Sequence, residues 1–240
     1  MAEFDITDPV VAAFIVIPVF LVGALAAMDA VGSRRLGEAR FATRRALLAV
    51  LCSGIWMVAT WLAAASGVLR NWTATPPPFA ILVVAIVAIA CRIAFGPAGR
   101  RLATGVPLWT LVIVQAFRLP LELAMHAMYL RGVMPVQMTY TGWNFDIVTG
   151  ATALVVGLAA WASRVPRSVV AAWNVLGLVL LVNVVTIAIV STPRIQAFGP
   201  DRVVVWVTYP PFVWLPAVMV LAALAGHLVI FRALRAGRRA

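Results

Sequence analysis

The sequence predicts an all-α protein that crosses a membrane seven times, as one integral-membrane domain over residues 1–240. Composition is the first reason, because 64% of the 240 residues are hydrophobic, 11% are charged and the mean hydropathy is +1.03. A soluble domain carries about 25% charged residues. The second reason is that seven apolar runs approach the length of about 20 residues that a helix needs to cross a bilayer. The third is that arginines gather between alternate runs.

The seven predicted spans follow one another with short connections. Their approximate bounds are residues 10–29, 46–67, 79–96, 106–130, 146–163, 168–191 and 210–231. The acidic start lacks a basic region, and arginines rather than a small-residue cleavage site follow the first run. We therefore interpret that run as a retained span and not as a signal peptide. Pro210 and Pro211 suit the start of the last helix, where a missing N–H costs little, and Pro216 is expected to bend it.

The arginines predict the orientation of the chain. Fourteen of them fall on one side of the membrane if seven spans alternate: Arg34, Arg35, Arg40, Arg44, Arg45, Arg92, Arg100, Arg101, Arg164, Arg167, Arg232, Arg235, Arg238 and Arg239. The other side receives only Arg70, Arg131, Arg194 and Arg202. Because cytoplasmic loops are rich in basic residues, we predict an outside N-terminus and a cytoplasmic C-terminus in the inner membrane of a bacterium.

The formal net charge of +11 raises the question of a nucleic-acid partner. The arginines lie at the ends of apolar runs rather than on one basic face, so we expect membrane lipids as the partner and no nucleic acid. The sequence indicates neither a homo-oligomer nor a particular partner subunit.

The fourth predicted span carries three ionisable residues, Arg118, Glu122 and His126, at intervals of four. Each residue turns a helix by about 100°, so the three side chains lie within about 80° of one another. Gln115 and Tyr129 fall on or beside the same face. An ionisable group at the centre of a span costs about 2.5–3.5 kcal/mol on insertion scales, and such groups face protein or water rather than lipid. This face is the predicted site.

Residues on neighbouring spans are expected to complete the site. Asn144, Asp146 and Tyr209 begin or end adjacent spans at the same outer level. Pro120 cannot donate a hydrogen bond to the carbonyl of Ala116, so it predicts a kink one turn below the cluster. Together these features predict a polar cavity that opens to the outer side. Asp146 has a structural alternative as the N-terminal cap of its helix.

Three functions fit this site. The leading hypothesis is binding or transport of a small polar or anionic solute with a proton: Arg118 attracts the anion, Glu122 holds Arg118 in the empty site, and His126 tunes the proton balance. A second is an enzyme in which Glu122 and His126 act as acid and base on a lipid or periplasmic substrate. A third is a non-catalytic subunit or sensor. The Arg118–Glu122 pair could also be purely structural, since removing one member of a buried pair costs about 3–5 kcal/mol.

No cofactor and no metal are expected. A retinal Schiff base needs a lysine, and the chain contains none. The two histidines, His126 and His227, are predicted at opposite depths, so they cannot hold one haem between them. No H-E-x-x-H pattern of a zinc hydrolase is present. A metal held by His126, Glu122 and Asp146 is an alternative that no ligand spacing supports.

Overall fold

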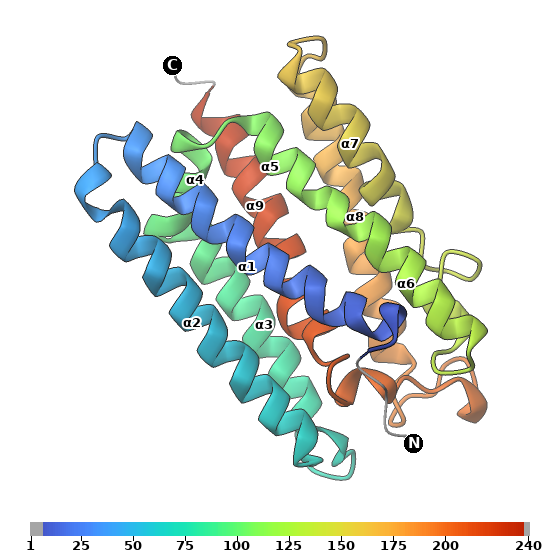
Figure 1. The fold of residues 1–240 in the computed structure, drawn as a ribbon. Coiled ribbons are helices and arrows are strands. Elements are labelled where there is room, and N and C mark those ends of the chain that lie inside the picture. The colour runs from blue at the N-terminus through green and yellow to red at the C-terminus, as the bar shows by residue number, and fades with distance from the viewer. Residues whose placement is uncertain (1–6, 238–240) are drawn as a thin grey trace.

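The computed structural model describes residues 7–237, and every regular element within them is a helix (Figure 1). The α-helices are α1 (Pro9–Arg35), α2 (Ala39–Ala65), α3 (Pro78–Phe95), α4 (Pro97–Gly105), α5 (Leu108–Val114), α6 (Arg118–Leu130), α7 (Ile147–Trp161), α8 (Arg167–Val190) and α9 (Leu221–Ala236). A 3-10 turn at Gln115–Phe117 joins α5 to α6, and a π-helical segment at Leu215–Val220 leads into α9. The predicted all-α fold class is confirmed.

Six helical stretches are long and apolar enough to cross a membrane, so the protein is a multi-pass helical membrane protein. They are α1, α2, α3, Leu108–Leu130, α8 and Leu215–Ala236. The predicted span 146–163 contains α7, which has only 15 residues. At 1.5 Å per residue it is about 22 Å long, less than the about 30 Å of a hydrocarbon core. The seventh crossing and the orientation of the chain therefore stay predictions.

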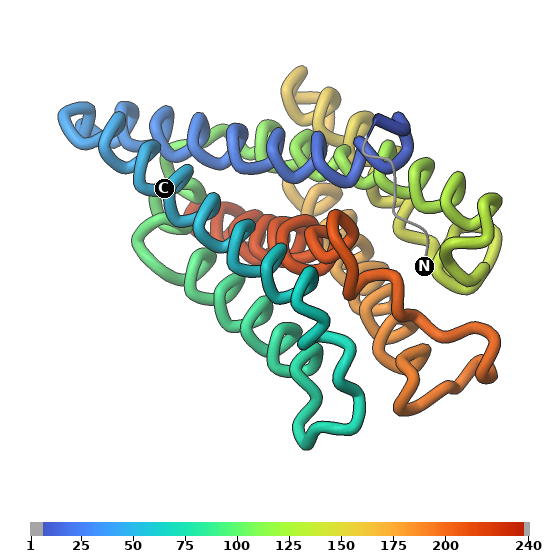
Figure 2. Tube along the Cα trace, turned by 60° about the horizontal axis from the view of Figure 1, so that its bottom comes forward, coloured from blue at the N-terminus to red at the C-terminus, as the bar shows by residue number. Residues whose placement is uncertain are grey.

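Helix α9 lies at the centre of the bundle (Figures 1 and 2). It packs between α3 and α8, and it also contacts α4 and α5. Helices α1 and α2 form an antiparallel pair, while α6 packs against α1 and α7. Arg118 at the start of α6 thus meets Asp146, just before α7, and Gly177 of α8.

Helix α2 lies at the edge of the bundle and turns an apolar face outward. Its side chains that are each more than half exposed include Leu47, Leu51, Ile55, Val58 and Leu62. These residues recur every three or four positions, which places them on one face of the helix. In a membrane protein lipid covers such a face. The buried core lies around the central helix α9.

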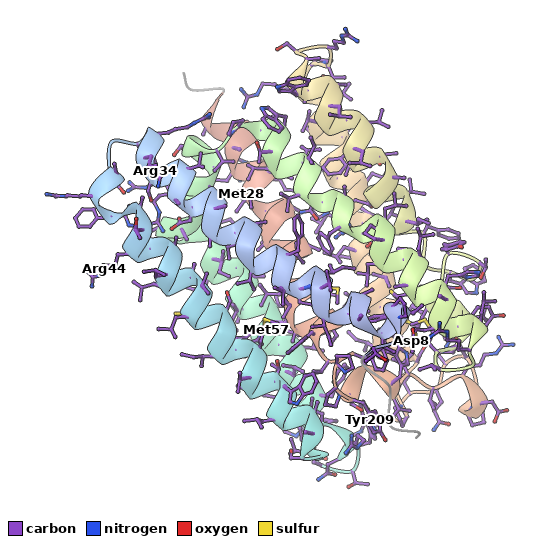
Figure 3. The ribbon with its side chains drawn as sticks, in the orientation of Figure 1. Asp8, Met28, Arg34, Arg44, Met57 and Tyr209 are labelled. Atoms are coloured by element: carbon purple, nitrogen blue, oxygen red, sulfur yellow. The ribbon has the colours of Figure 1, made fainter. Side chains whose placement is uncertain are left out.

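Arginines gather at one end of the bundle. Figure 3 shows Arg34 and Arg44 beside the turn between α1 and α2. At this end Arg101 of α4 forms an ion pair with Asp29 of α1 at 2.8 Å. Arg232 of α9 donates a hydrogen bond to the carbonyl of Ala94 at 2.9 Å. This grouping agrees with the prediction that the arginine-rich loops lie on one side of the membrane. Arg238 and Arg239 lie outside the described residues.

The opposite end holds the beginning of α1 and the end of α6. Asp8 caps α1 by accepting a hydrogen bond from the Val10 N–H at 2.8 Å, and it forms an ion pair with Arg131. The Val10 N–H and the Arg131 guanidinium lower the pKa of the Asp8 carboxyl. Figure 3 places Asp8 and Tyr209 at this same end. Each end of the bundle is therefore held together by its own set of polar contacts.

The last helix is irregular around Pro216, which the sequence predicts to bend it. Pro216 lies in the π-helical segment, which is the form that a helix takes when its ordinary bonding pattern is interrupted. The Trp56 indole N–H of α2 donates to the carbonyl of Ala217 at 2.8 Å. That bond satisfies a backbone group and ties α2 to the central helix.

Candidate functional site

The helix that carries the polar cluster changes its geometry just before the cluster begins. The segment from Gln115 to Phe117 is a 3-10 turn, and regular α-helix resumes at Arg118. Pro120 has no N–H for the carbonyl of Ala116, which explains why the ordinary pattern fails here. The irregular turn therefore lies where the sequence predicts a kink.

Arg118 is at the heart of the site and is only 1% exposed. Its Nη1 donates to the Asp146 carboxylate at 2.8 Å and to the carbonyl of Gly177 at 3.3 Å. The predicted pairing of Arg118 with Glu122 is wrong, because the ion pair joins Arg118 to Asp146. Asp146 occupies the N-cap position of α7, as the structural alternative has it, but its side chain makes no capping hydrogen bond to the backbone of that helix.

Two glycines allow close packing around this pair, Gly150 against the backbone of α6 and Gly177 against the side chains of His227 and Thr149. A Cβ at Gly150 of α7 would lie 2.3 Å from the Leu119 nitrogen, and one at Gly177 of α8 would lie 2.6 Å from His227 Cε1. Only a residue without a side chain fits such approaches. Because α7 lies directly on the backbone of α6, Asp146 at the start of α7 reaches Arg118. The spacing of four residues between Arg118 and Glu122 therefore does not decide which carboxylate forms the ion pair.

Glu122 is 2% exposed and has a different partner. The Asn144 Nδ2 donates to both Glu122 carboxylate oxygens, at 2.9 and 2.8 Å, and to the carbonyl of Met138 at 3.0 Å. The Asn144 Oδ1 accepts from the Asp146 N–H at 3.1 Å, so backbone contacts fix the orientation of the amide. Asn144 thus joins the second carboxylate to the loop that precedes Asp146.

His126, Tyr129 and Tyr209 lie apart from this cluster. The His126 ring stacks against Tyr140, with centroids 4.5 Å apart, and against Tyr129 at 5.8 Å. The Tyr209 ring lies under the Arg70 guanidinium at 4.1 Å. The structure therefore brings together Arg118, Glu122, Asn144 and Asp146 of the predicted set. The three residues considered as metal ligands, His126, Glu122 and Asp146, do not form a metal site in the part of the chain that the structure describes.

One buried polar group that is not among the predicted site residues lies next to the site. His227 of α9 is fully buried, and its Nδ1 lies 2.8 Å from the Asn174 Oδ1 of α8. The Asn174 Nδ2 donates to the carbonyl of His227 at 3.1 Å. Gly177 separates this pair from Arg118, because it meets the histidine ring and accepts from the guanidinium. A signal was present, since both residues are polar groups within apolar runs.

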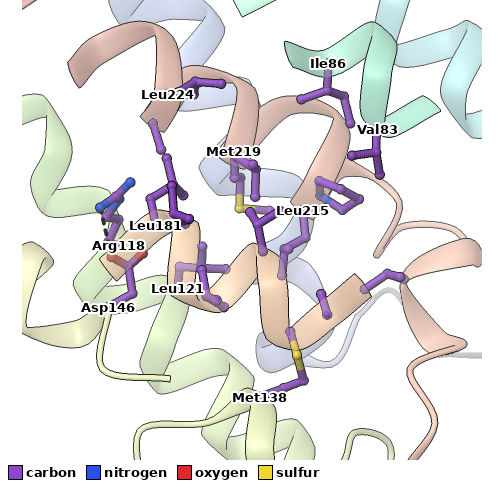
Figure 4. Close-up of a pocket in the computed structure, with 18 of the residues that line it drawn as sticks. Val83, Ile86, Arg118, Leu121, Met138, Asp146, Leu181, Leu215, Met219 and Leu224 are labelled. Atoms are coloured by element: carbon purple, nitrogen blue, oxygen red, sulfur yellow. Dashed lines mark hydrogen bonds and ion pairs between the residues drawn. The ribbon is translucent and has the colours of Figure 1, made fainter. Parts of the chain in front are cut away.

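A cavity of about 200 Å³ extends from the ion pair between α3, α6, α8 and the π-helical segment. Figure 4 shows Arg118 and Asp146 at one end of it, with Leu121, Leu181 and Met219 along the walls. Glu122 also lines the cavity, and nearly all the other lining side chains are apolar. It is somewhat larger than the about 150 Å³ cavity that holds a benzene molecule.

The cavity reaches the surface of the bundle between α3 and α8. Its lining includes Val87, Val182 and Ile189, which are 46%, 56% and 38% exposed. These apolar side chains lie within two helices that are long enough to cross the membrane. The opening therefore faces the lipid side of the bundle, whereas the sequence predicts an opening to the outer aqueous side.

Arg118, which lines this cavity, has two hydrogen-bond donors without a partner in the described part of the chain. Its Nε and Nη2 are buried and have no partner among the described residues, while Nη1 serves Asp146 and Gly177. The Nε–H and one Nη–H of an arginine form a planar edge with two parallel donors. That edge matches the two oxygens of a carboxylate, sulfonate or phosphate.

Comparison of the chain with protein-family models, with curated proteins and with solved structures finds no match. The functional interpretation therefore depends on the site itself.

Proposed function

We propose that the protein binds a small amphipathic acid, with the acid group on Arg118 and the apolar body in the cavity, and carries it together with a proton. The observation behind this proposal is the free Nε–Nη2 edge of a buried arginine at the end of an otherwise apolar cavity. Buried donors without partners are costly, so a site that offers two of them favours a ligand that accepts both. The lateral opening gives such a ligand access from the bilayer.

Glu122 is the group that we assign to the proton. It lines the cavity, whereas His126 does not. A bound anion adds negative charge near Asp146 and Glu122, which favours proton uptake by Glu122. Binding of the anion and binding of the proton therefore assist each other, and by thermodynamic linkage the effect is reciprocal.

The enzyme alternative has less support from the site. A lateral opening suits a lipid substrate, but the acid–base pair of Glu122 and His126 is not assembled at the cavity. No contact among the described residues favours the subunit or sensor alternative over binding.

We also propose that the chain lies in a bacterial inner membrane with its arginine-rich end in the cytoplasm. Positive charge on cytoplasmic connections supports this orientation. The start of α1 and the end of α9 lie at opposite ends of the bundle (Figure 1), which agrees with an odd number of crossings. In this arrangement α7 provides the seventh crossing.

The test uses 1-octanesulfonate, a permanent anion with an apolar chain. We expect it to raise the melting temperature of the purified protein in a saturable way, because a ligand that binds only the folded state stabilises it by RT ln(1 + [L]/Kd). Octanol, with the same chain and no charge, is the matched ligand control and should not reproduce the Arg118-dependent rise.

The variant that tests the site is Arg118→Gln combined with Asp146→Asn, which leaves neither charge unpaired. It should lose the stabilisation by octanesulfonate. Arg131→Gln is the matched control, because Arg131 follows the same helix but is exposed and outside the cavity. An equal rise in melting temperature for the double variant and the wild type would refute the proposal.

A further inference from the structure

A second and larger cavity lies farther along α3. Its volume is about 490 Å³, and its walls come from α1, α2, α3, α5 and α9. Ile55 and Cys52 of α2 line it and are exposed, so this cavity also reaches the lipid side of the bundle. Met28 and Ile93, near the arginine-rich ends of α1 and α3, line it as well.

Gln115 provides a buried polar group at this cavity. The residue is 2% exposed, and its Nε2 donates to the carbonyl of Ala223 at 3.3 Å. Because this contact requires a donor, the amide oxygen is the group left over, and Oε1 has no hydrogen-bond partner within residues 7–237. A Cβ at Gly226 would lie 2.0 Å from Nε2, so the glycine leaves room for the amide. A residue that lines the cavity thus carries one buried acceptor without a partner among the described residues.

Phe117 forms a wall shared by the two cavities. It lines both of them and is only 6% exposed. Both cavities also lie along α3. Val83 and Ile86 line the first cavity, and Ile89 and Ile93, farther along the helix, line the second. The two cavities are therefore consecutive along α3, and Phe117 lies at both, with Arg118 at the first and Gln115 at the second.

The two polar groups fit different protonation states of one carboxylic acid. The free edge of Arg118 has only donors and fits a carboxylate, whereas the free Oε1 of Gln115 is an acceptor and fits the O–H of a carboxylic acid. We propose that the second cavity binds the protonated, uncharged form of the same ligand, which makes the ligand a weak carboxylic acid. This inference rests on the proposed function of the first cavity.

The proton balance of this scheme is simple. Glu122, protonated from solution, gives one proton to the carboxylate bound at Arg118. The products are a neutral carboxylic acid and a Glu122 carboxylate, which accepts the two hydrogen bonds from Asn144. The neutral acid then passes Phe117 and donates its O–H to Gln115, so one proton moves with each ligand molecule.

The test counts ligands on the intact protein by native mass spectrometry. At about pH 5, close to the pKa of about 4.3 of a free carboxyl side chain, octanoate is partly protonated. We expect the wild type to bind two octanoate molecules and Gln115→Leu to bind one. Octanesulfonate stays ionised and should bind once to both proteins, which also shows that Gln115→Leu keeps an intact first cavity. Gln196→Leu, at an exposed loop position, should behave like the wild type.

Two octanoate molecules on Gln115→Leu, or a single one on the wild type, would overturn the inference. A reduced octanesulfonate count for Gln115→Leu would overturn it too, because the two sites would not be separate. Failure of the proposed function looks different, since the wild type would then bind no octanesulfonate. One Gln115-dependent octanoate on the Arg118→Gln and Asp146→Asn variant would support the second cavity by itself.

Discussion

The decisive contact at the scale of single residues is the buried pair of Arg118 and Asp146. Their side chains are 1% and 6% exposed, so both charges have lost nearly all contact with water or lipid. Such a pair is poor evidence for stability, because desolvation offsets much of the attraction. It leaves one edge of the guanidinium without a partner, and that edge gives the pair its proposed role in binding.

We predict that Arg118→Ala alone destabilises the protein by about 3–5 kcal/mol, because Asp146 would remain as an unpaired buried charge. The Arg118→Gln and Asp146→Asn combination should cost clearly less, because it buries no unpaired charge. Unfolding of both variants in the same detergent, followed by circular dichroism, measures the difference. Equal losses for both would show that the interaction of the two charges is not the dominant effect.

At the scale of elements, the close packing of α7 on α6 determines which charges meet. Gly150 permits this approach, and an irregular 3-10 turn immediately precedes Arg118. The sequence offers four-residue spacing between Arg118 and Glu122 as the obvious pairing. Helix packing instead supplies Asp146 from the start of α7, because α7 packs closely on the backbone of α6 at Gly150.

We predict that Gly150→Ala destabilises the protein by about 1–3 kcal/mol, because an added methyl group forces closely packed backbones apart. It should also weaken octanesulfonate binding, since Asp146 would move away from Arg118. The control is Gly54→Ala in α2, where a Cβ meets nothing within 4 Å. That change should stabilise α2 by up to about 1 kcal/mol. Thermal unfolding with and without octanesulfonate distinguishes the two, and equal behaviour would contradict the role of Gly150.

At the scale of the whole molecule, the two ends of the bundle differ in charge and in contacts. Arg101 and Arg232 fasten α1, α3, α4 and α9 together at one end, and the Asp8–Arg131 pair fastens α1 to the end of α6 at the other. Helix α7 is the element whose length leaves the crossing number open. Its two flanking loops decide between six and seven crossings.

We predict that the loops on the two sides of α7 lie on opposite sides of the membrane. The experiment replaces Cys52 and Cys91 by alanine and introduces one cysteine, either Thr141→Cys or Ala162→Cys, at exposed loop positions. A membrane-impermeant thiol reagent added outside intact cells should label position 141 and leave 162 unlabelled until the membrane is opened. Labelling of both positions from outside would mean that α7 does not cross.

The sequence by itself determined that this chain is a helical membrane protein, where most of its spans lie and which helix carries the polar cluster. Hydropathy and charge placement are local properties, so they can be read along the chain. Arg118 and Glu122 became candidates because ionisable groups in apolar spans are costly, and Asn144 and Asp146 because they lie where a neighbouring span begins.

Only the tertiary structure decided which of those groups meet. It paired Arg118 with Asp146, gave Glu122 to Asn144, placed His126 among tyrosines and brought His227 beside the site. Cavities, their lateral openings and the shared wall at Phe117 also arise between helices that are distant in the sequence. Helix neighbours depend on close backbone approach at particular glycines, and no periodicity within one helix encodes which surface of another it will meet.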